Sequence, residues 1–145
     1  MTGRPSSFTQ EIGDAICERL ANGESLRSIC RDEEMPSQPT VFRWIDSHEA
    51  FRKQYARARE AQAEFFADQI VSIADDGSND SYVDDEGNQR TDHDVIARSR
   101  LRVDARKWIA SKLLPKKYGD KVTNEHTGAD GGPIVIQATP QDNDL

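Results

Sequence analysis

Three polar side chains in one short segment, Gln38, Thr40 and Arg43, carry groups that can read base edges in DNA. A glutamine amide can bond adenine in bidentate fashion, and an arginine guanidinium can do the same with guanine. They are interleaved with the apolar residues Val41 and Trp44, so a helix would turn the two sets toward different sides. The spacing predicts a short helix with a buried apolar face and an outward face suited to the major groove.

Basic side chains elsewhere in residues 1–60 could bind DNA phosphates. Such contacts fix the position of a protein on the duplex but do not distinguish one base sequence from another. These candidate phosphate contacts are Arg4, Arg27, Arg31, Arg52 and Lys53. The alternative is an ordinary three-helix bundle with solvated charges. The segment holds nine basic and ten acidic side chains, so a single copy should bind DNA weakly. Several copies in one assembly would raise the affinity through avidity.

Three short helices between residues 8 and 47 are expected to position these side chains. Thr9 can cap the first helix and Ser25 the second, and Ser37 or Gln38 opens the third. Three short helices, the last two joined by a tight turn, are the outline of a helix-turn-helix module.

A longer helical region is expected next. Residues 49–75 contain no proline or glycine, and a helix of that length would be about 40 Å long. A small domain cannot cover such a helix alone, so its apolar stripe should meet another helix or another subunit. Residues 76–93 are polar and are expected to form a loop with a small β-hairpin. A helix should then run from about 94 to 114 and end at Pro115.

Charge is distributed in blocks along this region. Residues 61–94 hold one basic and ten acidic side chains, whereas residues 95–121 hold nine basic and two acidic ones. Arg98, Arg102 and Arg106 recur every four residues and form a continuous stripe on a helix. The stripe could grip phosphates, but the opposite charge of the adjoining segments favours ion pairing within or between subunits. The expected acidic partners are Glu60, Glu64 and Asp68.

The final segment combines a glycine-rich joint with the apolar run Ile134, Val135 and Ile136. A lone strand of this length is not stable in water, so it should pair with a sister subunit. Residues 139–145 are expected to form a flexible acidic tail.

No residue pattern indicates an enzyme, a cofactor or a metal site. The histidines lie in different units, no GxxxxGK[ST] phosphate loop is present, and the acidic loop lacks calcium-site spacing. Cys17 and Cys30 fit small buried thiols in a reducing compartment. No run approaches the roughly 18 apolar residues of a membrane helix, and the N-terminus lacks a signal-peptide apolar region. We therefore expect a soluble, intracellular protein without membrane contact.

Three segments in order resemble the terminase small subunits of tailed bacteriophages, across most of residues 3–137. These segments are GRPSSFT at 3–9, PTVFRWIDSHEAFRKQYARARE at 39–60, and Asp92-His93-Asp94 followed by RLRVDARKWIASKLLPKKYGDK at 100–121. A helix-turn-helix alone would be weak evidence, because regulators share it. The three segments together are far more specific.

The resemblance implies a mainly α fold with three parts. Residues 1–48 would form the helix-turn-helix domain that binds the viral packaging site on double-stranded DNA. Residues 49–120 would be the central long-helix region with its small hairpin, which assembles a homo-oligomeric ring of roughly 8–10 subunits. Residues 121–145 would supply an inter-subunit β-strand and a tail.

The resemblance also implies partners and interface residues. The partner protein would be the terminase large subunit, which holds the ATPase and nuclease sites, and the setting would be the host bacterial cytoplasm. Phe65, Ile70, Leu101 and Trp108 would belong to the central helical core or interface, and residues 134–136 would form the shared strand. The full set of interface candidates is Tyr55, Phe65, Ile70, Arg98, Leu101, Arg102, Trp108, Ile134, Val135 and Ile136.

Two other functions remain open from the sequence. A dimeric helix-turn-helix transcriptional regulator would need a two-fold interface and half-sites about one helical turn apart. It would have no use for the C-terminal strand. A purely structural ring adaptor would never read DNA.

Overall fold

The first helices begin at residues that cap them. In the computed structural model, which describes residues 3–136, the first three helices are α1 (Gln10–Ala21), α2 (Leu26–Ile29) and α3 (Gln38–Ser47). The Thr9 hydroxyl oxygen accepts a hydrogen bond from the Ile12 amide at 3.2 Å, and the Ser25 hydroxyl accepts one from the Ser28 amide at 3.1 Å. Each cap satisfies an amide that has no partner within its helix. The three predicted helices and both predicted caps are confirmed.

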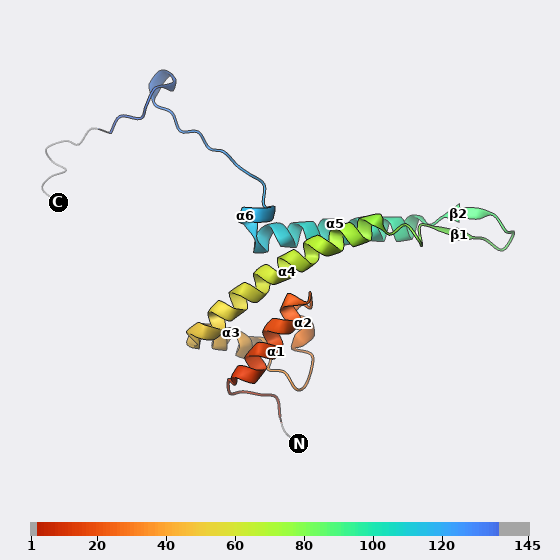
Figure 1. Ribbon diagram of the computed structural model, residues 1–145, viewed down its shortest axis with the longest axis horizontal. Helices are drawn as coiled ribbons and strands as arrows, with labels where there is room; N and C mark the ends of the chain where they lie inside the picture. The colour runs from red at the N-terminus through yellow and green to blue at the C-terminus, as the bar shows by residue number, and fades with distance from the viewer. Residues whose placement is uncertain (1–2, 137–145) are drawn as a thin grey trace, which may run out of the picture.

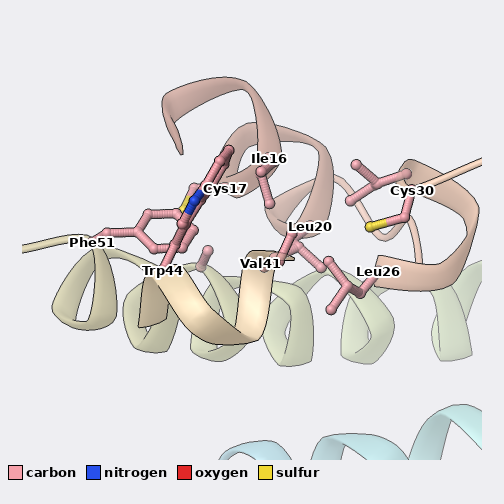
Figure 2. Packing of buried hydrophobic residues seen from close by; sticks show 10 residues of the cluster. Ile16, Cys17, Leu20, Leu26, Cys30, Val41, Trp44 and Phe51 are labelled. Carbon is pink, nitrogen blue, oxygen red and sulfur yellow. The ribbon is translucent and has the colours of Figure 1, made fainter. Parts of the chain in front are cut away.

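The core of the N-terminal region gathers side chains from four helices. Ile16 and Leu20 of α1 and Val41 of α3 are fully buried, and Trp44 is 2% exposed. Phe51, in the first turn of α4 (Glu49–Asp75), is 1% exposed and belongs to the same cluster. Figure 2 shows these side chains turned toward one another between the helices. We call residues 3–62, which share this core, the head.

Phe8, which precedes α1, packs its aromatic ring against that core. Its ring lies 5.4 Å from the Trp44 ring and 5.3 Å from the Phe51 ring, centroid to centroid, and it stacks on His48 at 4.4 Å. Offset and edge-on aromatic contacts at these distances stabilise a core beyond their buried area. The N-terminal segment is thereby held against the head.

The remainder of the helical region forms an arm, residues 63–118. α4 continues out of the head to Asp75, and α5 (His93–Leu113) returns beside it, as Figure 1 shows. At the far end, β1 (Ser81–Val83) and β2 (Gln89–Thr91) pair antiparallel, with Tyr82 opposite Arg90. The long helix and the hairpin agree with the sequence prediction.

The side of α5 that packs on α4 is not the side of its largest apolar residues. Ala110 is 2% exposed and Val103 is half-buried, whereas Leu101 is 57% and Trp108 63% exposed. Leu101 and Trp108 were expected to lie in the helical core or in a subunit interface. Within one chain they do not lie in the core, and the interface role stays a prediction.

The chain beyond α5 differs from the prediction in one detail. Pro115 does not simply end the helical region but opens a short helix, α6 (Pro115–Tyr118), since proline is suited to a first helical turn. A 3₁₀ turn, η1 (Ala129–Gly131), follows, and residues 132–136 form no strand in the single chain. The expected strand depends on pairing between subunits and stays a prediction, and the expected tail at 139–145 lies outside the described residues.

Candidate nucleic-acid interface

The short helix α2 is fixed in place by Arg19 of α1, a residue that the sequence did not single out. The Arg19 guanidinium bonds the Glu24 carboxylate at 2.8 Å and the Asp32 carboxylate at 3.1 Å, one before and one after α2. Hydrogen bonds from Arg19 hold the pKa of Glu24 below its ordinary value. This bridge sets the path of the chain from α1 through the turn that leads to α3.

The outward face of α3 carries the three candidate base-reading residues. Val41 and Trp44 point into the head and are almost fully buried, as the sequence predicts. Arg43 is exposed, and Gln38 and Thr40 are half-exposed near the beginning of the helix. The three polar side chains therefore lie on one helix, with Gln38 and Thr40 in its first turn and Arg43 in its second.

The hydrogen-bonding groups of this face are not equally free. The Thr40 hydroxyl lies 3.0 Å from the Ser37 hydroxyl, so it already has a local partner. The Gln38 amide makes no side-chain hydrogen bond within residues 3–136. Of these groups, the Gln38 amide is therefore the most available for an adenine edge.

The N-terminal segment runs beside α3. Arg4 Nη1 donates a hydrogen bond of 2.6 Å to the Cys30 carbonyl oxygen at the end of α2. Arg43 Nη2 donates a longer bond of 3.4 Å to the Ser6 carbonyl oxygen. The weak, exposed bond leaves the Arg43 guanidinium able to turn toward another acceptor, whereas Arg4 anchors the segment to the head.

The other candidate phosphate contacts differ in their partners. Arg27, Arg31 and Arg52 are exposed, and none of them forms an ion pair with another of the described residues. The Lys53 ammonium pairs with Glu49 one turn earlier on α4 at 3.3 Å. The three arginines are therefore better placed to bind phosphate than Lys53, whose charge is partly compensated.

A buried amide at the end of the head, one residue before the arm begins, ties the turn after α1 to α4. Gln62 is 2% exposed, and its side-chain amide donates a 2.8 Å hydrogen bond to the Glu24 carbonyl oxygen. Its own oxygen accepts a 2.7 Å bond from Arg59. Beside it, Gly23 has a φ of +95° and lies so close to Phe65 that an added Cβ would overlap the ring. The turn after α1 is therefore seated directly on α4.

The interface candidates fall into two groups in the structure. Tyr55 packs against the head core and Phe65 against the Gly23 turn, so both already have contacts within the chain. Ile70 is half-buried. Leu101, Trp108 and residues 134–136 are exposed, and Trp108 borders a groove that Leu26 and Phe66 also line. The second group has apolar surface left for a partner.

The arginine stripe does not pair with the long helix inside one chain. Arg98 and Arg102 form no ion pair among residues 3–136, and Arg106 donates to the Gln69 amide oxygen at 2.7 Å. The carboxylate of Glu64 instead accepts bonds from Lys117 and Tyr118, each at 2.6 Å. The expected pairing with Glu60, Glu64 and Asp68 is therefore wrong within the chain, because α5 turns Arg98 and Arg102 toward solvent. Pairing between subunits stays a prediction.

Other kinds of site have little support in the described part of the chain. Residues 3–136 contain no group of three or more His, Cys, Asp or Glu side chains that could hold a metal ion. Burial raises the pKa of the Cys17 thiol to about 11, which keeps it protonated and unreactive. None of the described helices is long and apolar enough to cross a membrane.

A three-helix head that continues into a long two-helix arm with a small hairpin defines a modular, mainly helical protein. The chain belongs to the family described as Bacteriophage Sf6, terminase small subunit-like, whose sequence model matches residues 8–125. No curated protein sequence matches the chain significantly.

Crystal structures of point mutants of the terminase small subunit gp1 from the bacterial virus Sf6 are similar to this chain in fold and sequence. One is 45% identical with a TM-score of 0.66, and the match covers 94% of this chain and 95% of that one. Another is 44% identical with a TM-score of 0.65, over 93% of this chain and all of the other. The family match and the shared fold confirm the resemblance to terminase small subunits that the sequence showed.

Proposed function

We propose that this protein binds the packaging site on viral double-stranded DNA as a homo-oligomeric ring of roughly 8–10 subunits. The ring recruits the terminase large subunit, which supplies the ATPase and nuclease activities, in the host bacterial cytoplasm. The observation that carries the proposal is α3, where Arg43 is exposed and Gln38 and Thr40 are half-exposed, while Val41 and Trp44 are buried in a well-packed head.

Tight DNA binding by this head requires several copies. Its segment holds almost equal numbers of acidic and basic side chains, so few counterions are released when one head meets DNA. Tethering many heads in one particle raises the effective concentration of each for the same duplex. An assembly of many heads, each of which binds DNA weakly, can therefore bind selectively although the head carries no net positive charge.

Assembly through the arm has support from its unpartnered surface. Leu101 and Trp108 are seven residues apart and lie on one side of α5, where both are exposed. Head-to-tail contacts between unlike surfaces form a ring when their rotation closes. We therefore assign the ring contact to this side of the arm, together with residues 134–136.

The first test is the native mass of the purified protein by light scattering or native mass spectrometry. A single closed assembly well above a tetramer supports the proposal. A stable dimer contradicts it and favours a transcriptional regulator with two half-sites.

The second test compares DNA binding by the wild type and a triple variant, Gln38→Ala, Thr40→Ala and Arg43→Ala. The probe is a set of fragments from the phage genome, measured by fluorescence anisotropy at fixed salt. We expect the triple variant to lose the preference for one fragment while keeping its native mass. Lys107→Ala is the control, because it removes one exposed charge from the arm. An unchanged preference in the triple variant would mean that α3 does not read DNA.

A further inference from the structure

Phe42 is the only exposed large hydrophobic residue of the head, residues 3–62, and its side chain is 52% exposed. Its neighbours in sequence, Val41 on one side and Trp44 two positions on, are almost fully buried. Full burial of a phenylalanine side chain is worth roughly 1.5–3 kcal/mol. The head forgoes more of this stabilisation at Phe42 than at its partly buried hydrophobic residues, and Phe42 is in α3.

The direction of Phe42 follows from helix geometry. Successive residues of an α-helix are about 100° apart, so Phe42 points to one side of Val41 and lies next to Arg43. Arg43 is exposed and contacts the N-terminal segment at Ser6. Phe42 therefore borders the same outward face as the polar residues that we assign to DNA.

The surroundings of Phe42 do not resemble a protein interface. The exposed residues nearest to it on α3 are Pro39, Arg43 and Asp46, and the charges of Arg43 and Asp46 limit the apolar surface around it to the small ring of Pro39. Subunit contacts have a continuous apolar core, as the exposed Leu101 and Trp108 on the arm could provide. A single apolar ring among polar groups fits a target that has small apolar spots on a polar surface.

We propose that Phe42 contacts the C5-methyl group of a thymine in the major groove and contributes sequence specificity to the head. The thymine methyl is the one apolar group that a base pair presents in that groove, and apolar side chains, phenylalanine among them, contact it. The inference rests on the proposed function, because it needs α3 to lie in the major groove. It names a base-reading residue that hydrogen-bonding chemistry alone does not identify.

This contact differs physically from the arginine contacts. An apolar contact neutralises no phosphate, so it releases no counterion and adds affinity that does not depend on salt. Such a contact suits a head with no net positive charge. Loss of Phe42 should weaken selective binding by the same factor at every ionic strength. Loss of Arg52 should instead reduce the slope of log binding constant against log salt concentration by about 1.

The experiment begins with selection of bound duplexes from a random-sequence pool by the wild-type assembly. The selected duplex is then measured with wild type, Phe42→Ala and Phe42→Leu, and again with each selected thymine replaced by deoxyuridine. One lost methyl corresponds to about 0.8 kcal/mol, so wild type should bind one substituted duplex about 4-fold more weakly. Phe42→Ala should bind the unmodified duplex roughly 10-fold more weakly and show no further loss with deoxyuridine. Phe42→Leu keeps an apolar side chain and should recover part of the discrimination.

The outcomes separate this inference from the proposed function. If wild type selects no sequence, the proposed function fails. If wild type selects a duplex that Phe42→Ala binds equally well, only the Phe42 inference fails.

A deoxyuridine effect of equal size in wild type and Phe42→Ala overturns the Phe42 inference as well, because the methyl would then act through DNA shape. A changed native mass for Phe42→Ala overturns it too, since Phe42 would then belong to a subunit contact. Val71→Ala is the matched control, as Val71 is an exposed apolar residue of the arm.

Discussion

The head and the arm are built from the same kind of helix but use their apolar residues differently. In the head, Ile16, Leu20 and Val41 are fully buried, and Phe42 alone among the large hydrophobic residues is exposed. In the arm, Leu101 and Trp108 are more than half exposed, and Ala110 is the only α5 residue that is almost fully buried. The head thus completes its core within one chain, whereas the arm does not.

This contrast indicates which functions need a neighbour. A region that is fully packed alone can recognise a ligand as a single copy, although weakly when its charge is balanced. A region that exposes large apolar side chains gains stability when a partner covers them. Recognition should therefore depend on the head, and assembly on the arm.

The largest expected effect is on head stability. Phe51→Ala removes a ring that is 1% exposed and should lower the free energy of unfolding by about 3–5 kcal/mol, through lost burial and the cavity left behind. Urea unfolding followed by circular dichroism at fixed protein concentration measures it. Val71→Ala should change stability by no more than about 0.5 kcal/mol. Equal losses in the two variants would remove the contrast between head and arm.

The next largest effect concerns assembly. The double variant Leu101→Ala and Trp108→Ala should raise the concentration at which the assembly dissociates by at least about 10-fold, because each side chain is worth roughly 1.5–3 kcal/mol when fully buried. Sedimentation velocity over a dilution series measures this, with Lys107→Ala as the control. Head unfolding in urea should stay the same. A wild-type mass profile in the double variant would show that this side of α5 is not an interface.

A smaller effect is expected at the junction of the two regions. Gln62→Leu leaves the Glu24 carbonyl and the Arg59 guanidinium without their partner and should cost about 1–3 kcal/mol. Amide hydrogen exchange around residues 23–26 should quicken. Gln54→Leu, which breaks an exposed bond to Asp14, is the matched control and should change little. Unchanged exchange in Gln62→Leu would mean that apolar packing alone holds the turn after α1 on α4.

The smallest effect is the pH response of α6. Hydrogen bonds from Lys117 and then Tyr118 hold the pKa of Glu64 below its ordinary value of 4.5. A lowered carboxyl pKa stabilises the folded form at neutral pH, and this contribution is lost as the pH falls through the lowered pKa. Tyr118 ring signals in NMR should therefore shift on acidification, and Glu64→Gln should abolish that shift. A shift that persists in the variant would assign it to another group.

Local sequence signals predicted most of the fold. Caps at Thr9 and Ser25, and the uninterrupted run from 49 to 75, located the helices because each signal acts within a few residues. The docking of Phe8 on Trp44 and Phe51 was missed, because a contact across more than thirty residues leaves no local pattern. The side of α5 that meets α4 was also missed, since apolar residues occur on more than one side of that helix.

The site shows the same division between local and distant information. The polar residues of α3 were predicted from the spacing of Val41 and Trp44, which fixes the outward side. The compensation of Lys53 by Glu49 was open to prediction from their i, i+4 spacing. The Gln62 bond to the Glu24 carbonyl was not, because nothing in a run of polar residues distinguishes a buried glutamine from a solvated one.

The Gln62 bond also has a geometric consequence for an assembly of many copies. Because α4 runs unbroken from the head into the arm and Gln62 ties the turn after α1 to it, we expect each head to move with its arm, so that the packing of the arms sets the distance between neighbouring α3 helices. B-DNA presents the same groove face only once per turn, about every 34–36 Å along its axis. The assembly would then select duplexes in which the spacing of the binding sites matches the spacing of its α3 helices. Where the two spacings differ, the DNA would have to bend.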